Sequence, residues 1–465
     1  MSKFSRIVVA GLSGGTGKTI VSLGLARAWA RRGLTVQPFK KGPDYIDANW
    51  LSLAAGRSCT NLDPFFLDAD RIRSLFQHRA GDARISLVEG NRGLFDGMDE
   101  AGTCSTSELA RQLGAPVVLA VDCTKMTRTI AAIVQGCVSF EPGLHLAGVI
   151  CNRTAGERHR SILRRSIEAH TDVPVLGMLP KLLANPIPER HMGLVSDQEY
   201  EAGQYDGQAH ALDAVADMAE EWLDVEKIFA VAGQAPGMQA AAPVWAEPAQ
   251  DKTVRIGYVH DQALWFYYRE NLEALEQAGA ELVRLSLMDD KPWPEIDGLY
   301  LGGGFPETLA PQLAANAGRR EHVAALCRSG MPVYAECGGF MYLCRELEFE
   351  GDMYPMAGVF PVVTTFCRRP QGLGYTIATA DLPNPFHPLG KTLRGHEFHY
   401  SRCVAGDEGA SLEFAMRMER GKGMHEGRDG LVFRNTFAGY NHIHAFAAPW
   451  WAPAFVRTAQ EYKAR

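Results

Sequence analysis

The sequence predicts an α/β protein built from two doubly wound α/β domains. The first observation is its length, because 465 residues exceed what one ordinary domain holds and suit two or three. The second is that short apolar runs alternate with segments of helical periodicity along most of the chain. The third is a change of composition near residues 230–252, after which the same alternation restarts.

In the first part of the chain, apolar runs typical of buried strands alternate with stretches of helical periodicity. The predicted strands are 6–11, 36–39, 85–90, 116–123, 145–153 and 174–180. The predicted helices are 18–32, 105–113, 128–140 and 157–169. Near-continuous apolar strands separated by helices imply a parallel sheet that is covered by helices on both faces.

A stretch rich in Ala, Pro, Gly and Gln then interrupts the pattern, and its weak periodicity predicts a linker between domains. We therefore expect one domain over 1–225, a linker over 226–252 and a second domain over 253–465. In the second domain the predicted strands are 255–260, 281–287, 299–302 and 332–335, and the predicted helices are 268–278, 309–328 and 340–346. The last hundred residues are rich in strand-forming residues and punctuated by glycine.

Charge and cysteine usage exclude several classes of protein. A net charge of −7 provides no basic field that would attract nucleic acid or an anionic membrane surface. The ten cysteines form no CxxC pair, which favours reduced thiols in the cytosol. The N-terminus lacks the features of a signal peptide, and no apolar run is long enough to span a bilayer. We therefore expect a cytoplasmic protein that binds neither nucleic acid nor membrane.

A glycine-rich loop follows the first predicted strand and precedes a predicted helix. Glycines let the backbone turn its N–H groups toward phosphates, and the helix N-terminus favours an anion. A lysine supplies charge to the phosphoryl group, and the following hydroxyl can bind Mg²⁺. The residues predicted to bind ATP in this loop are Gly14, Gly15, Thr16, Gly17, Lys18 and Thr19. A glycine turn without a ligand is the alternative.

Acidic residues follow the ends of neighbouring strands, where ligands of open α/β sheets gather. Glu89 ends the strand 85–90 and is a candidate ligand of Mg²⁺. Asp44, Asp47 and Asp96 also follow strand ends, although each could be an ordinary turn aspartate. Basic residues in the same loops would offset a polyanionic substrate and ATP, or would form a solvated basic face: Lys40, Lys41, Arg92, Arg153 and Arg158.

A cysteine in the second domain lies between a strand and a small-residue turn. Cys337 follows the strand 332–335 and precedes a predicted helix, an arrangement that exposes a nucleophile at the top of a sheet. The N–H of Gly338 can face an oxyanion, and the loop that contains Gly303 and Gly304 offers a second donor. A base is required, and the candidates are His442 and the supporting His444, which share a face if they lie on a strand. Either could instead be a satisfied core histidine.

These segments together resemble the cobyrinic acid a,c-diamide synthase family over nearly the whole chain. Each motif is short, but their order and spacing are highly specific. The stretches that carry the resemblance are QPFKKGPDYID (37–47), NLDPFFL (61–67), VEGNRGLFDG (88–97), GVICNR (148–153), GERH (156–159), IPERHMGLV (187–195), LYLGGGFPE (299–307), YAECGGFMYL (334–343), RGHEFHYS (394–401) and YNHIH (440–444).

The resemblance implies a fold and a reaction for each half. The N-terminal half would be a P-loop NTPase domain of the dethiobiotin-synthetase type, and the C-terminal half a class I-like glutamine amidotransferase. Such enzymes amidate the c and then the a acetate of cobyrinic acid, using ATP with Mg²⁺ to phosphorylate each carboxylate and ammonia from glutamine to displace phosphate. The family is thought to pass ammonia between the halves without release to solvent.

Individual residues match the family's motifs. Lys18 and Thr19 match phosphate and Mg²⁺ contacts, and Glu89 matches an Mg²⁺ ligand. Asn152 lies where related ATPases contact adenine, Cys337 matches the glutaminase nucleophile, and His442 matches its histidine. The resemblance, together with the basic residues in these loops, predicts four residues that contact the substrate: Asp44, Tyr45, Arg92 and Asp96. Asp44 is also a candidate metal ligand.

The sequence also departs from related proteins at three positions. Ser13 stands where partition ATPases carry an extra lysine, and Ala335 stands where many glutaminases have glycine. His444 stands where triad glutaminases have glutamate, so the resemblance implies a Cys–His dyad in place of a full triad. Near relatives share this H-x-H pattern.

Other acceptors and functions remain open from the sequence. The acceptor could be hydrogenobyrinic acid or nickel sirohydrochlorin, and a cobyric acid synthase shares both halves but amidates other side chains and lacks the second histidine. A partition-like ATPase switch with a non-functional amidotransferase domain is the alternative of another class, against which Ser13 and the intact Cys337 both argue. The sequence does not give the oligomeric state, for which a homodimer is one candidate.

Overall fold

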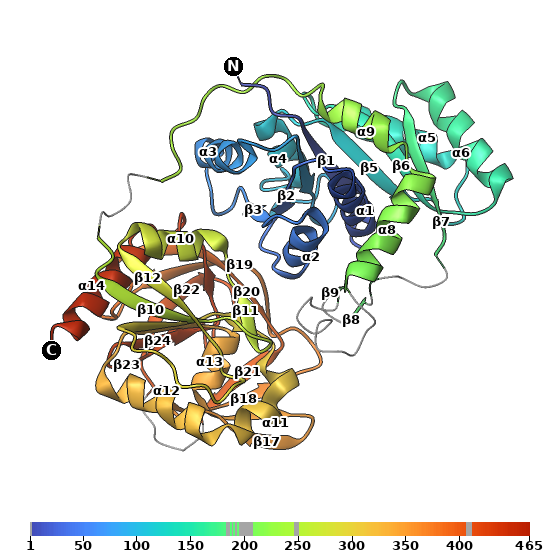
Figure 1. Ribbon diagram of the computed structural model, residues 1–465. Coiled ribbons are helices and arrows are strands. Elements are labelled where there is room, and N and C mark those ends of the chain that lie inside the picture. The colour runs from blue at the N-terminus through green and yellow to red at the C-terminus, as the bar shows by residue number, and fades with distance from the viewer. Residues whose placement is uncertain are drawn as a thin grey trace. The chain divides into compact units, whose positions relative to one another are not determined.

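The chain forms two compact units, Met1–Val244 and Trp245–Arg465. The computed structural model describes residues 2–182, 187, 189–190, 193–194, 208–245, 251–405 and 412–465. The expected first domain ended at residue 225, whereas the first unit continues to Val244 and includes a helix within the predicted linker. Figure 1 shows the elements of each unit, labelled as in the text.

The first unit contains a 7-stranded sheet whose neighbouring strands are all parallel, as predicted. The strand order is β3-β2-β4-β1-β5-β6-β7. The strands are β1 (Arg6–Gly11), β2 (Val36–Lys41), β3 (Thr60–Leu62), β4 (Ile85–Glu89), β5 (Val117–Asp122), β6 (Leu146–Thr154) and β7 (Val175–Pro180). Nearly all their residues are buried, which explains the continuous apolar runs.

Helices connect these strands (Figure 1). Four were predicted within a residue or two: α1 (Lys18–Arg31), α4 (Thr106–Leu113), α5 (Thr129–Phe140) and α6 (Glu157–His170). The others described are α2 (Ile46–Ala55), α3 (Ala69–Ala80), α8 (Gln208–Trp222) and α9 (Val225–Ala232), and a short hairpin pairs β8 (Glu189–Arg190) with β9 (Gly193–Leu194). Most of the IPERHMGLV motif lies outside the described residues.

Helix α9 corrects the predicted start of the linker. The side chain of Asp224 accepts a hydrogen bond from the Lys227 N–H at 3.0 Å and so caps the helix. Val225, Ile228 and Val231 are buried, so this short helix packs against the first unit. Its eight residues span little more than two turns, too few for helical periodicity to be distinct from the Ala-rich sequence that follows.

The second unit contains a 10-stranded sheet that is parallel in one half and antiparallel in the other. Its order is β12-β10-β13-β15-β24-β23-β22-β19-β20-β25, and the first five strands are parallel. These are β12 (Ala280–Leu285), β10 (Val254–Val259), β13 (Gly298–Leu301), β15 (Val333–Glu336) and β24 (Thr436–Gly439). The antiparallel half has β23 (Arg428–Phe433), β22 (Phe414–Arg420), β19 (Gly372–Ala380), β20 (Thr392–His399) and β25 (His442–Ile443).

Shorter elements complete this unit. β11 (Leu264–Phe266) pairs with β14 (Gly303–Gly304), and a 4-stranded sheet contains β16 (Cys344–Phe349), β17 (Asp352–Pro355), β18 (Phe360–Phe366) and β21 (Ser401–Ala405). The helices are α10 (Arg269–Gln277), the 3₁₀ helix η2 (Pro306–Leu309), α11 (Ala310–Ala315), α12 (Ala317–Ser329), α13 (Gly338–Leu343) and α14 (Trp451–Lys463). The glycine-punctuated C-terminal region is therefore β-rich, as expected.

Two helices predicted in this unit differ from the structure. The predicted helix 309–328 is divided at Asn316, whose side chain accepts a hydrogen bond from the Arg319 N–H at 3.2 Å and starts α12. The predicted helix 340–346 ends at Leu343, because Cys344 is extended and begins β16. A local side-chain cap and a sheet partner thus override the helical periodicity.

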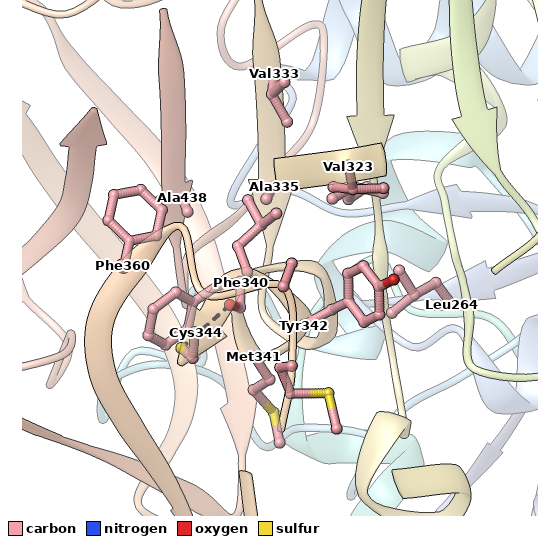
Figure 2. Close-up of a cluster of buried hydrophobic side chains, with 14 of the residues drawn as sticks. Leu264, Val323, Val333, Ala335, Phe340, Met341, Tyr342, Cys344, Phe360 and Ala438 are labelled. Atoms are coloured by element: carbon pink, nitrogen blue, oxygen red, sulfur yellow. Dashed lines mark hydrogen bonds between the residues drawn. The ribbon is translucent and has the colours of Figure 1, made fainter. Parts of the chain in front are cut away.

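An apolar core lies beneath the turn at Cys337. Figure 2 shows residues of one buried cluster, among them Val333 and Ala335 of β15, Ala438 of β24, and Phe340 and Tyr342 of α13. All five side chains are buried. Because such a core is closely packed, it resists displacement of the turn that carries the cysteine.

Among the described residues, no helix combines the length and apolar character required to cross a membrane.

Candidate active sites

The glycine-rich loop of the first unit connects β1 to α1, and two of its glycines have positive φ angles. Gly15 and Gly17 have φ values of 73° and 95°, a region that L side chains rarely adopt. A Cβ at Gly17 would also overlap the side-chain amide of Asn152. That amide donates a hydrogen bond to the Thr16 carbonyl at 2.8 Å. Asn152, at the end of β6, therefore holds the loop, while its predicted contact with adenine stays a prediction.

Lys18 begins α1 and folds its side chain back over the loop. Its ammonium group donates a hydrogen bond to the Ser13 carbonyl at 2.8 Å. Burial lowers the pKa of Lys18, and the nearby Glu89 carboxylate partly opposes that effect. The glycine-rich loop therefore holds a cation against its backbone, as expected of a phosphate site.

A buried charge cluster lies beside this loop, at the ends of β2 and β4. The Lys40 ammonium contacts Glu89 Oε1 at 2.9 Å and Asp47 Oδ2 at 2.6 Å. Thr19 donates its hydroxyl hydrogen bond to the same Glu89 oxygen at 2.7 Å. Burial alone would lower the pKa of Lys40, but the surrounding carboxylates raise it well above its ordinary value. Lys40 is therefore a cation fixed between two acids.

The donor set fits a magnesium ion that also binds phosphate. Glu89 is buried and its Oε2 has no hydrogen-bond partner among the described residues, so this oxygen can accept a cation. Burial raises the pKa of Glu89, and Lys40 partly opposes the rise. The described residues contain no group of three or more His, Cys, Asp or Glu side chains that could hold a metal by themselves. Mg²⁺ commonly takes one or two carboxylates and completes its shell with phosphates and water.

The four predicted substrate residues differ in their surroundings. Asp44 Oδ1 accepts a hydrogen bond from the Asp47 N–H at 2.9 Å, and Asp96 Oδ2 accepts one from the Gly93 N–H at 3.0 Å. Both bonds are those of turn aspartates. Asp44 also lies 3.9 Å from the Lys40 ammonium, and burial together with Asp47 raises the pKa of Asp44 to about 7.

The loops that carry these residues meet the glycine-rich loop. The Leu94 N–H donates to the Gly11 carbonyl at 2.7 Å, which joins the segment after β4 to the end of β1. Arg92 is exposed with a φ of 52°, and Tyr45 is largely buried at the start of α2. The segment between β4 and α4 therefore presents Arg92 and Asp96 next to the phosphate loop.

In the second unit, Cys337 occupies a strained turn between β15 and α13. Its backbone has φ 46° and ψ −100°, a conformation that costs free energy and is concentrated at functional sites. The Cys337 N–H donates to the Gly439 carbonyl of β24 at 2.7 Å, which fixes the turn. Burial raises the pKa of the Cys337 thiol, the Glu307 carboxylate adds to the rise, and the Gly338 N–H opposes it. A thiol in this environment requires a base.

The predicted glycines surround the turn and permit close approach. A Cβ at Gly303 would lie 2.5 Å from His442 Cε1, and a Cβ at Gly338 would lie 2.9 Å from the Gly304 nitrogen. Gly303 and Gly304 form β14, which pairs with β11. The structure thus brings Gly303, Gly304, Gly338 and His442 to the turn that contains Cys337.

His442, the histidine of the expected Cys–His dyad, has an acidic partner in the structure, while the dyad itself stays a prediction. His442 Nδ1 lies 3.0 Å from Glu336 Oε2, and each side chain is 1% exposed. The position two residues after His442, where triad glutaminases carry glutamate, holds His444. His444 lies 3.8 Å from Glu270 of α10, away from this pair. The available signal was the acidic residue directly before the nucleophile in Tyr334-Ala-Glu-Cys337.

Both units match the models of known protein families. Residues 7–195 match the family described as "CobQ/CobB/MinD/ParA nucleotide binding domain". Residues 255–450 match the family described as "CobB/CobQ-like glutamine amidotransferase domain". The two matches cover the first unit up to β9 and most of the second.

Curated relatives match the chain over nearly its full length. A cobyrinate a,c-diamide synthase of Magnetococcus marinus is 40% identical, and the alignment covers 99% of this chain and 98% of the relative. Proteins of the same name from Syntrophotalea carbinolica and Archaeoglobus fulgidus are 41% and 39% identical. Those alignments cover 97% and 98% of this chain and 98% of each relative.

The contact of Asn152 with the phosphate loop predicts a specific loss of ATP affinity. Asn152→Ala removes the hydrogen bond to the Thr16 carbonyl, and a bond of this kind contributes about 1 kcal/mol, or roughly fivefold in Kd. Titration calorimetry with ATP measures the change. Gln135→Ala, an exposed position on α5 of the same unit, is the control and leaves Kd unchanged. An unaltered ATP affinity in Asn152→Ala contradicts the supporting role.

Proposed function

This chain belongs to the cobyrinate a,c-diamide synthase family, and we propose on that basis that it amidates the a- and c-acetate carboxylates of cobyrinic acid in cobalamin biosynthesis. It is a carbon–nitrogen ligase that uses ATP as co-substrate and glutamine as nitrogen donor. The full-length similarity carries this proposal. The phosphate loop and the buried cysteine turn support it independently, because the reaction requires one site for each activity.

In the first unit, the residues around the phosphate loop would activate the carboxylate. An acetate oxygen of the substrate attacks the γ-phosphorus of ATP, which forms an acyl phosphate and releases ADP. Lys18 exchanges its bond to the Ser13 carbonyl for the phosphates, and the loop N–H groups hold them. Ammonia then attacks the acyl carbon, phosphate leaves, and the excess proton passes to solvent. Two such cycles give the diamide.

Magnesium is part of this proposal. Thr19 and Glu89 would hold the ion, with Asp44 as a further predicted ligand, and the ion would neutralise charge on the phosphates. The Lys40 ammonium contacts Glu89 Oε1 at 2.9 Å and so holds the carboxylate in place. Asp44, Tyr45, Arg92 and Asp96 are proposed to contact the anionic substrate, which the clustering of these loops supports.

In the second unit, Cys337 and His442 would release ammonia from glutamine. The Cys337 thiol gives its proton to His442 as sulfur attacks the side-chain amide carbon. The N–H groups of Gly338 and Gly304 would stabilise the oxyanion, and the close approach of these two residues supports this role. The imidazolium returns the proton to the departing nitrogen, ammonia leaves, and water hydrolyses the thioester to glutamate.

The alternatives from the sequence have less support. A partition-like switch would not require the strained cysteine turn with its histidine, glycines and glutamate. Hydrogenobyrinic acid and nickel sirohydrochlorin would undergo the same chemistry, and the names of the relatives favour cobyrinic acid. A cytoplasmic location, a homodimer, and the absence of nucleic-acid and membrane partners stay predictions.

A comparison of acceptors tests the proposal. With ATP, Mg²⁺ and glutamine, we expect cobyrinic acid to gain one and then two amides, detected by mass spectrometry, with one ADP released per amide. Hydrogenobyrinic acid and nickel sirohydrochlorin should react with a kcat/KM at least about tenfold lower, equal to about 1.4 kcal/mol of discrimination. Preferential turnover of either alternative acceptor would change the assigned substrate. ATP turnover that is independent of all three acceptors but increases with DNA would favour the partition-like ATPase switch.

Substitutions test whether glutamine hydrolysis and carboxylate activation occur at separate sites. Cys337→Ala should lower glutamine-dependent amide formation by at least about 10³-fold, because the nucleophile is lost, while added ammonium salts still support amidation. Lys18→Ala is the matched variant in the other unit and should abolish amide formation from both nitrogen sources. Both rates are measured by mass spectrometry of the product. Loss of the ammonia-driven reaction in Cys337→Ala would contradict separate sites.

A further inference from the structure

We propose that Glu336 is the positioning residue that orients His442 and balances the charge this histidine gains when it takes the Cys337 proton. The inference rests on the proposed glutaminase function of the second unit. Related glutaminases have their acid two residues after the histidine. In this chain the corresponding acid would be Glu336, which directly precedes the nucleophile. The observation that carries it is the buried contact of 3.0 Å between His442 Nδ1 and Glu336 Oε2.

The sheet register explains how residues distant in sequence meet. β15 and β24 are parallel, and Glu336 is paired with Gly439. Three residues beyond Gly439 the chain reaches His442, so the histidine lies beside the end of β15. Cys337 turns sharply away at this point. One short strand end therefore presents the acid and the nucleophile in consecutive positions, and the next strand brings the base.

The hydrogen bond also determines which histidine nitrogen acts as base. A carboxylate only accepts hydrogen bonds, so the proton of a neutral His442 lies on Nδ1 and is donated to Glu336. Nε2 is then the basic nitrogen of the ring. When Nε2 takes the thiol proton, the adjacent Glu336 side chain stabilises the imidazolium that forms.

The second oxygen of Glu336 is held by a chain of two hydrogen bonds. The Tyr300 hydroxyl donates to Glu336 Oε1 at 3.0 Å, and the Asn271 amide donates to the Tyr300 oxygen at 3.2 Å. Asn271 also donates to the Ile443 carbonyl at 3.0 Å and accepts from the Ala445 N–H at 2.7 Å. The same side chain thus fixes the carboxylate and the segment that carries His442. Such a network limits rotation of both partners.

The other acid near this segment does not fit the role. Glu270 lies 3.8 Å from His444, beyond hydrogen-bond distance. His444 packs at 4.9 Å against the Tyr268 ring, whereas His442 stacks at 4.8 Å on the His396 ring. Burial lowers the pKa of His396 well below its ordinary value, and an imidazole ring carries no negative charge that could balance an imidazolium. Glu336, by contrast, contacts His442 directly, with 3.0 Å between Oε2 and Nδ1.

Glu336→Gln tests the proposal in the full chain with cobyrinic acid, ATP and glutamine. The amide keeps the size of the side chain but removes the charge and can force the wrong tautomer, so kcat for glutamine-dependent amidation should fall by about 10²- to 10⁴-fold. KM for glutamine should change by less than about threefold, because Glu336 does not contact substrate. Glu336→Asp should recover part of kcat. Amidation driven by added ammonia should equal the wild-type rate.

Two further variants keep the test decisive. Glu270→Gln, the matched change at the neighbouring acid, should retain glutamine-dependent kcat within about threefold. Tyr300→Phe retains the Glu336 charge and loses one hydrogen bond, so kcat should fall about tenfold, and this variant tests the network if Glu336→Gln does not fold.

The outcomes separate this inference from the function on which it rests. The role of Glu336 would be overturned if Glu336→Gln kept a glutamine-dependent kcat within tenfold of wild type, or if Glu270→Gln lost as much. If Glu336→Gln does not fold, an unchanged kcat in Tyr300→Phe would overturn it. Absence of glutamine-dependent amidation in the wild-type protein would instead overturn the proposed function.

Discussion

Parallel strand pairing is the constraint on which both candidate sites depend. In the first unit β4 lies between β2 and β1, and the register pairs Glu89 with Lys40 on one side and Val9 on the other. The carboxylate therefore ends its strand between a lysine and the start of the phosphate loop. In the second unit the pairing of Glu336 with Gly439 has the same effect. Because parallel strands end at one edge, each sheet collects its reactive groups there.

Because the charged side chains of both sites are buried, each of them requires a partner in the folded protein. Lys40 and Glu89 are 2% and 0% exposed, and removal of one partner from such a buried pair typically costs about 3–5 kcal/mol because the other charge is left uncompensated. Glu336 is held from both oxygens, by His442 and Tyr300. The same surroundings raise the pKa of the Cys337 thiol, so a buried nucleophile requires a base that is already oriented. Fixed polar networks and a strained turn in the same core are consistent with a site organised before substrate arrives.

Much of the fold could be predicted because local patterns determine it. The buried strands of the first sheet produce continuous apolar runs, and β1 begins and ends where expected. Helix α2 was missed because its residues are apolar on most sides, which removes the contrast that periodicity requires. The residues of the two candidate sites were found from motifs, since glycine loops and a strand-end cysteine are local signals. The Glu336–His442 contact was not, because its partners are 106 residues apart and only the sheet register brings them together.

The central claim is that one chain transfers the glutamine amide nitrogen to carboxylates activated by ATP. Mass spectrometry after turnover of [amide-¹⁵N]glutamine with cobyrinic acid labelled by ¹⁸O in its carboxylates tests it most directly. We expect one ¹⁵N in each new amide and one ¹⁸O in each phosphate released, because phosphate leaves with a carboxylate oxygen. Unlabelled phosphate would contradict activation through an acyl phosphate, and amides without ¹⁵N would contradict glutamine as the nitrogen source.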